Sequence, residues 1–233
     1  MRQFLVTTPL VDYQHSEIQS LIEAKNWRQL NAITAAEQIY NFVKDDIEFG
    51  YSETDTLTAS QVLKQGYGQC NTKGTLLVAL LRACGIPTRV HGFEIANDLK
   101  QGLIPTLLTW FAPKSIIHSW VEVYLEERWV ELEGYIIDDG YLKQVQQQFS
   151  MAKNFTGFGI STPCLQQPDN RFSLNGAYIQ KQSITRDLGL YTSPDALYQQ
   201  HKNLTGIKQW LYAHCFRHWI NQRVRRVRAG RFN

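Results

Sequence analysis

The chain of 233 residues has a formal net charge of +3, with 43% hydrophobic, 12% aromatic and 19% charged residues. That composition excludes a disordered chain, because a sequence this long and this apolar can bury a sizeable core. The charge is unevenly distributed: residues 202–233 hold two Lys, six Arg and no acidic residue, which gives +8, whereas the 16 basic and 21 acidic residues before them give −5. An acidic body with a basic C-terminal segment is therefore expected.

Two amphipathic helices are predicted within the first 65 residues, over 16–24 and 33–43. Apolar residues recur in both segments at spacings of three and four, which is the period of one helix face. A third helix is predicted over 72–84, where six consecutive residues at 76–81 are apolar. Such a helix is buried on every side, and Gly85 and Pro87 end it.

Beyond this helix the pattern changes to the two-residue alternation of strands. Residues 88–93, 119–125 and 128–132 alternate and are rich in Val, Tyr and Trp, which predicts three strands. The 24 residues at 94–117 form an insertion that Gly102 and two prolines interrupt. We expect a loop that packs down its own apolar side chains, in preference to a flap beside a cleft.

The four cysteines are widely spaced, and none lies in a C-x-x-C pair or near a His at zinc-finger spacing. Neither a zinc site nor a disulfide framework is indicated. Reduced thiols and a cytoplasmic location are expected, because the apolar run within residues 1–10 is too short for a secretory signal peptide with its cleavage site. No run approaches the roughly 18 apolar residues of a membrane span.

Cys70 stands at the start of the predicted buried helix. Unsatisfied backbone N–H groups and the positive end of the helix dipole favour a thiolate at that position, which makes the sulfur a candidate nucleophile. Cys84 ends the same helix, where the dipole opposes a thiolate, and Cys164 and Cys215 lie elsewhere. These three are interpreted as small buried hydrophobes.

A thiolate needs a base, and the base needs an acceptor that orients it. His118 leads into the second predicted strand, and Glu133 follows the third. If residues 126–127 form a two-residue turn, Glu133 falls on the face of His118, one diagonal step away. A turn with an odd number of residues would move Glu133 to the opposite face, and Asp138 and Asp139 would then be the reserve acids.

Taken in order, these motifs closely resemble the transglutaminase-like superfamily over roughly residues 17 to 138. The resemblance is carried by Gly68-Gln69-Cys70, the end of the buried helix, the strand that starts at His118, and Trp129 with Glu133 four residues later. It implies a papain-related α+β fold, in which a helical N-terminal part contributes a central buried helix that packs on an antiparallel sheet. It also implies a Cys70, His118 and Glu133 triad, although Glu133 stands where the family has an Asp.

The same resemblance implies a bacterial-type single-domain member with a catalytic core over residues 1–140. Residues 141–233 lie outside the family pattern and are expected to form a mostly helical extension that packs on the core. The implied reaction is acyl transfer at an amide through a thioester, either hydrolysis of a peptide or isopeptide bond or transamidation. A protein or peptide substrate is expected, and no cofactor, metal or membrane is required. The backbone N–H of Cys70 is a candidate oxyanion donor, and the sequence names no second one.

Whether water or an amine accepts the acyl group is left open by the residues. A dry apolar channel would favour the amine, and Trp110, Phe111 and Trp120 are candidate walls for it.

The alternative is a catalytically inactive module of the same fold that uses its basic C-terminal helix for protein or nucleic-acid contacts. Apolar residues within 207–228 spread around the predicted helix axis, which disfavours a helix lying on a membrane surface. Four arginines there could neutralise phosphates, but docking on the acidic body is favoured over nucleic acid. They are Arg223, Arg225, Arg226 and Arg228.

Overall fold

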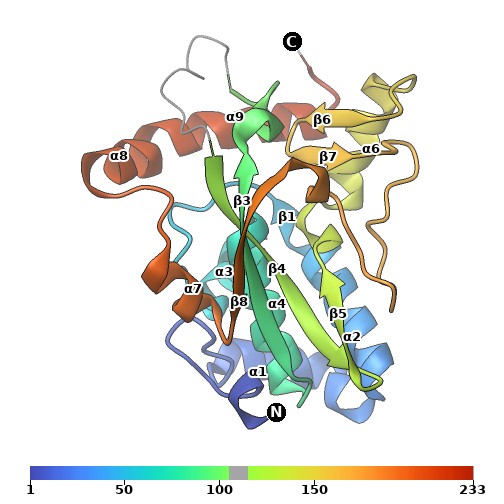
Figure 1. Cartoon of the computed structure of the whole chain (residues 1–233), viewed down its shortest axis with the longest axis vertical. Coiled ribbons are helices and arrows are strands. Elements are labelled where there is room, and N and C mark those ends of the chain that lie inside the picture. The colour runs from blue at the N-terminus through green and yellow to red at the C-terminus, as the bar shows by residue number, and fades with distance from the viewer. Residues whose placement is uncertain (105–114, 233) are drawn as a thin grey trace.

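The structure is a computed structural model that describes residues 1–104 and 115–232 (Figure 1). Its first part is helical and its centre is a four-stranded antiparallel sheet in the order β5-β4-β3-β8. The expected α+β fold is confirmed. The helices of the first part are α1 (Ser16–Lys25), α2 (Ala32–Asn41), α3 (Ala59–Gln65) and α4 (Cys70–Ala83). The sheet strands are β3 (Thr88–Ala96), β4 (Ser115–Leu125), β5 (Arg128–Leu132) and β8 (Ile184–Tyr191).

The apolar helix α4 is the centre of the core, as its sequence predicts. Its residues from Leu76 to Leu81 have no solvent exposure, because α4 contacts β4 of the sheet and is covered by α1, α2 and α3. Its last turn ends at Gly85, whose φ of 77° lies in the left-handed region where glycine is favoured. The helix begins at Cys70, two residues before the predicted start, so the sulfur is carried by the first residue of the helix.

Gln69 fixes the start of α4 as its N-cap. Its backbone N–H donates to Thr72 Oγ1 at 3.2 Å, and Thr72 Oγ1 in turn donates to Gln69 Oε1 at 3.3 Å. This reciprocal pair is a capping box, which holds the first turn at a defined place. The preceding strand β2 (Tyr67–Gly68) pairs in parallel with β1 (Glu48–Phe49). The backbone of Cys70 is therefore positioned by this strand pair on its N-terminal side and by the capped first turn of α4 on its C-terminal side.

The hairpin of β4 and β5 has the predicted two-residue turn. Leu125 pairs with Arg128 and Tyr124 with Trp129, in the register that places Glu133 near His118. Glu126 and Glu127 both have positive φ, 46° and 60°, which is the backbone of a type I′ turn. Glutamate is a poor residue for that conformation, because its Cβ crowds the backbone there.

Replacing Glu126 with Asn and Glu127 with Gly is expected to stabilise the protein by about 1 kcal/mol, since Asn-Gly is the preferred pair for a type I′ turn. The measurement is the free energy of unfolding in urea. The double change of both residues to Gln is the matched control, because it removes the same two charges and keeps the unfavourable backbone. Equal stabilisation by both variants would assign the effect to charge repulsion.

The C-terminal part contributes to the central sheet as well as covering it. Strand β8 pairs with β3 at the edge of the sheet, so residues far apart in the sequence form one layer (Figure 1). The remaining elements are the hairpin β6 (Phe155–Gly157) and β7 (Ile160–Thr162), and the helices α6 (Asp139–Gln148), α7 (Pro194–Gln200), α8 (Gly206–Leu211) and α9 (Arg217–Arg228). No helix in the described part of the chain is long and apolar enough to cross a membrane.

The basic helix α9 docks on the acidic body through one of its arginines. Arg228 Nη1 and Nη2 donate to the two carboxylate oxygens of Asp138 at 2.5 and 2.9 Å. Arg223 Nε donates to the carbonyl oxygen of Gly102 at 3.0 Å, whereas Arg225 and Arg226 are exposed. Arg228 thus binds a carboxylate of the acidic body, as the charge distribution predicts, and Arg223 binds a backbone carbonyl.

Candidate active site

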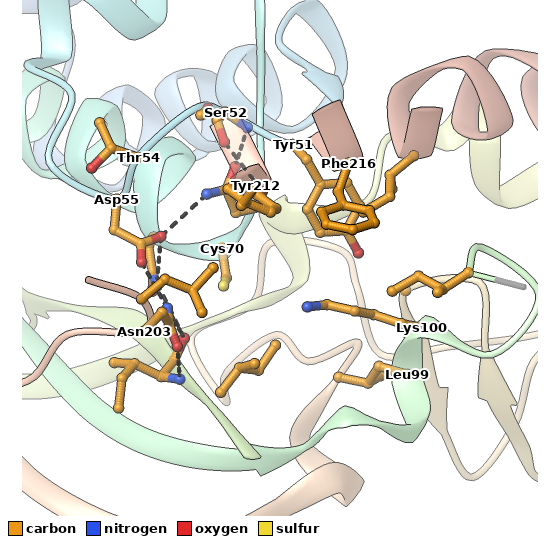
Figure 2. A pocket seen from close by; sticks show the side chains of 18 of the residues that line it. Tyr51, Ser52, Thr54, Asp55, Cys70, Leu99, Lys100, Asn203, Tyr212 and Phe216 are labelled. Carbon is orange, nitrogen blue, oxygen red and sulfur yellow. Dashed lines mark hydrogen bonds between the residues drawn. The ribbon is translucent and has the colours of Figure 1, made fainter. Parts of the chain in front are cut away.

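The sulfur of Cys70 points into a pocket of about 530 Å³ (Figure 2). Cys70 itself is 7% exposed. The pocket lies between the start of α4, the short helix η4 (Asn97–Lys100), the beginning of β4 and the C-terminal helices. Of the four cysteines, only Cys70 is among the residues that line this pocket.

His118 and Glu133 meet beside Cys70 in the interior of the protein. His118 lies in β4 and Glu133 directly follows β5, so the register of the hairpin brings the two together. The ring nitrogen Nε2 of His118 lies 2.9 Å from Oε1 of Glu133, and neither side chain is exposed. The predicted pairing of these two residues is therefore observed as a direct hydrogen bond.

The second carboxylate oxygen of Glu133 is held by the backbone of the C-terminal part. Oε2 accepts hydrogen bonds from the N–H groups of Ile179 at 2.7 Å and Gln180 at 2.9 Å. These two donors fix the carboxylate from the side opposite His118. No sequence signal could have identified them, because any residue except proline supplies a backbone N–H.

The other ring nitrogen of His118, Nδ1, is buried and has no hydrogen-bond partner among the described residues. The Cys70 side chain is close enough to the ring to influence its pKa. Burial opposes the charged ring, but the negative charge of Cys70, followed by the hydrogen bond and charge of Glu133, raises the pKa of His118 to about 10. The arrangement thus favours a protonated imidazole between two negative groups.

The reserve acids Asp138 and Asp139 lie outside this cluster. Asp138 is occupied by Arg228 and also accepts from the N–H groups of Phe49 and Tyr141, both at 2.9 Å. Burial raises the pKa of Asp138, but these contacts outweigh it and hold the value below its usual range. Asp139 pairs with Lys44. Both are therefore structural partners of other elements.

Trp120 is not a wall of the pocket. It lies on the sheet against Phe93, with ring centroids 4.2 Å apart, and is absent from the pocket lining. Tyr178 and Lys181, from the segment that also holds Glu133, cover its other side. The other two candidate walls, Trp110 and Phe111, lie outside the described residues.

The apolar wall of the pocket comes from the C-terminal helices. α8, α9 and the single π-helical turn η7 (Tyr212–Phe216) between them form a rod across one end of the sheet (Figure 1). Their apolar lining residues are Leu211, Tyr212, Phe216, Trp219 and Ile220, and α8 adds the polar Lys208 and Gln209. Phe216 and Trp219 are also 37% and 39% exposed, so they border solvent.

Among the described residues, the pocket is lined by three charged residues that were not predicted from the sequence: Asp55, Lys100 and Lys208. Asp55 accepts hydrogen bonds from Gln69 Nε2 at 3.2 Å, Asn71 Nδ2 at 3.0 Å and Asn203 Nδ2 at 2.7 Å. Lys100 extends its ammonium into the pocket from the opposite side (Figure 2). None of the three stands in a motif with Cys70, and only the folded chain brings them to one pocket.

The described residues contain no group of three or more His, Cys, Asp or Glu placed to hold a metal ion. The site combines a sulfur at the first residue of a helix with a nearby histidine that is hydrogen-bonded to a buried carboxylate. These are the side-chain types that nucleophilic catalysis by cysteine uses.

Comparisons with known proteins found a matching family model and similar solved structures. Residues 22–134 match the model of the Transglutaminase-like superfamily. Among solved structures, a putative cysteine protease from Cytophaga hutchinsonii shares 14% identity, with a TM-score of 0.48 and coverage of 83% of this chain and 47% of that one. Red sea bream transglutaminase shares 20% identity, with a TM-score of 0.33 and coverage of 53% and 25%. The chain thus spans about half and a quarter of their lengths, and no curated protein matches it.

Proposed function

We propose, on the premise that residues 22–134 belong to the transglutaminase-like superfamily, that this protein is an enzyme of cysteine-dependent acyl transfer at an amide bond. The proposed triad is Cys70, His118 and Glu133. The observation that carries the proposal is the position of the His118 ring, which is hydrogen-bonded to Glu133 through Nε2, keeps Nδ1 without another partner among the described residues, and lies close enough to Cys70 for that side chain to raise its pKa. A protein or peptide supplies the amide.

In the first half of the proposed reaction, the Cys70 thiolate attacks the carbonyl carbon of the amide. The C–N bond breaks, the His118 imidazolium gives its proton to the leaving amine, and a thioester on Cys70 remains. The backbone N–H of Cys70 is at the start of α4, where it has no intrahelical acceptor, and would donate to the oxyanion.

In the second half, the acceptor attacks the carbonyl carbon of the thioester and gives its proton to His118. The C–S bond breaks, the acylated product leaves, and the Cys70 thiolate is restored beside the His118 imidazolium. Water gives hydrolysis, and an amine gives transamidation. Both halves need the same ring orientation, which Glu133 and the two backbone donors to its second oxygen supply. The apolar wall from the C-terminal helices limits water at the sulfur and thereby supports transfer to an amine.

The division into a catalytic core over residues 1–140 and an extension over 141–233 is part of the same proposal. The extension contributes the apolar wall and the donors that hold Glu133, so it is proposed to complete the site. We expect it to be required for activity and to fold with the core.

Iodoacetamide at about pH 6 tests the proposed nucleophile. An unassisted thiol is almost wholly protonated at that pH and reacts slowly, whereas a thiolate paired with an imidazolium reacts. Cys70 should therefore be labelled ahead of the exposed Cys164 and Cys215, as measured by mass spectrometry of the peptides. Cys84 should resist, because burial raises its pKa to about 11 against the weaker opposing effect of Arg28.

The variant His118→Ala is the control for this labelling. It should slow the reaction at Cys70 and leave Cys164 and Cys215 unchanged. Equal labelling of the accessible thiols, or labelling of Cys70 that is indifferent to His118, would favour the catalytically inactive binding module.

A further inference from the structure

Lys100 places a positive charge in the pocket without a negative partner. It is the last residue of η4, and Figure 2 shows its ammonium directed toward the region of Cys70, on the other side from Asp55. No carboxylate oxygen of the described residues lies within ion-pair distance of its Nζ. The undescribed segment 105–114 contains no Asp or Glu either. Among the described residues, the Lys100 ammonium lies over the ring of Tyr51, at 6.0 Å from the centroid.

Apolar side chains around Lys100 raise the free energy of its charged form, because they keep water away from the ammonium. Leu99, Ile95 and Ile104 line the pocket beside it, and the aromatic wall from the C-terminal helices lies across from it. Burial lowers the pKa of Lys100 to about 8, while the negative charges of Asp55 and Cys70 act in the opposite direction. At neutral pH the side chain is therefore still largely protonated. A partly desolvated and unpaired charge is normally offset by a partner, here one that a ligand would bring.

The side of the pocket opposite Lys100 carries a negative charge, that of Asp55. The carboxylate of Asp55 is bound by three side-chain amides, which satisfy its oxygens without cancelling its charge. An anion is therefore repelled at the Asp55 side and attracted at the Lys100 side, and the sulfur of Cys70 lies between them (Figure 2). This polarity orients a negatively charged ligand relative to the nucleophile.

We propose that Lys100 binds a carboxylate of the substrate, so that the pocket selects amides with a negative charge close to the bond under attack. This inference rests on the proposed function, because it specifies the substrate class of the same site. The carboxylate can belong to a chain terminus or to an acidic side chain, since both present the same two oxygens to an ammonium.

Two small alkylating reagents test this selection without knowledge of the substrate. Iodoacetate and iodoacetamide both transfer a two-carbon group to the Cys70 sulfur and release iodide, but only iodoacetate carries a carboxylate. The measurement is the ratio of their rate constants at Cys70, at about pH 7, by mass spectrometry. The rate constant for iodoacetate divided by that for iodoacetamide should be about tenfold higher in the wild type than in Lys100→Met or Lys100→Gln. This is the size expected for one partly desolvated charge pair.

Two further variants control for charge. Lys100→Arg keeps the cation and should keep most of the preference for iodoacetate. Lys64→Met removes one positive charge from the exposed end of α3, away from the pocket, and should leave the ratio unchanged. Thermal unfolding of each variant shows whether it is folded.

The outcomes separate this inference from the proposed function. If iodoacetamide fails to label Cys70 selectively in the wild type, the proposed nucleophile is wrong. If Cys70 is labelled but the ratio does not change in Lys100→Met, or both rates fall by the same factor, Lys100 does not select carboxylates and the inference is overturned. Iodoacetylglycine and the α-amide of iodoacetyl-aspartate then distinguish the two carboxylate sources, because the first carries a terminal carboxylate and the second a side-chain one.

Discussion

Replacing Cys70 with Ala lowers kcat for amide-bond turnover by about 10⁴-fold or more, because the proposed thioester cannot form without the sulfur. The fold should tolerate the change, since it removes a single sulfur atom from a side chain that lines the pocket. The measurement is the release of amine or ammonia from peptide amides. Mass spectrometry should show an acyl group on the wild type at Cys70 and none on the variant.

Cys215→Ala is the matched control for that experiment. Cys215 is exposed in η7, close to the residues that form the apolar wall, but it does not line the pocket. Its removal should leave kcat unchanged. Turnover that survives in Cys70→Ala and is lost in the control would mean that another residue is the nucleophile.

Replacing Glu133 with Gln has the second largest expected effect, a fall in kcat of about 10⁴-fold with a much smaller change in KM. The two backbone donors from Ile179 and Gln180 require an oxygen acceptor, so the Gln amide would place its oxygen there and its NH₂ group toward His118. His118 Nε2 would then have to accept, which puts the proton on Nδ1. A ring protonated at Nδ1 cannot take a proton from Cys70.

Glu133→Asp tests the length of the side chain at the same place. An Asp carboxylate starts from the same backbone but is one methylene shorter, so it cannot reach both His118 and the two donors that now bind Glu133. We expect a loss of the order of 10²-fold, the size that a misplacement of about 1 Å can cause. Glu131→Gln is the control, because Glu131 binds Tyr178 and Lys181 at the surface and makes no contact with His118.

These rates are measured with the wild type and all three variants under single-turnover conditions. Full activity of Glu133→Gln would show that the ring needs no carboxylate to orient it. A loss in Glu131→Gln equal to that in Glu133→Gln would mean that the effect comes from the general loss of charge.

The hairpin explains why so much of the site could be predicted from the sequence. A two-residue turn fixes the register of β4 and β5, and register decides which side chains share a face. The apolar run of α4 also predicts this helix and the place of Cys70 near its start, although the helix begins at Cys70, two residues before the predicted start. These are local features, and local features carry most of the information that a single sequence gives.

The rest depends on contacts between distant segments. Alternation placed Trp120 correctly in a strand, but it could not say that residues 178–181 cover that face of the sheet. The apolar residues of the C-terminal helices spread around the axis because they serve two purposes. Ile220, Val224 and Val227 pack into the core, whereas Phe216 and Trp219 face the pocket and solvent.

Lys100 and Asp55 show the same limit more clearly. They are 45 residues apart in the sequence, and each stands in a segment without a recognisable motif. Their importance comes from their surroundings in the described part of the chain. The Lys100 ammonium has no carboxylate partner there, the Asp55 carboxylate is bound by three neutral amides, and the two lie on either side of Cys70.

The most direct test of the Cys70, His118 and Glu133 unit is to measure the protonation state of the His118 ring as a function of pH. Nuclear magnetic resonance of the two ring nitrogens reports this state. Because Cys70 and Glu133 raise the pKa of His118 to about 10 against the effect of burial, the ring should remain doubly protonated throughout the neutral range. It should lose its proton at a lower pH in Cys70→Ala, where one negative partner is gone. A neutral His118 ring at pH 7 in the wild type, or a titration that Cys70→Ala does not change, would contradict the proposed unit.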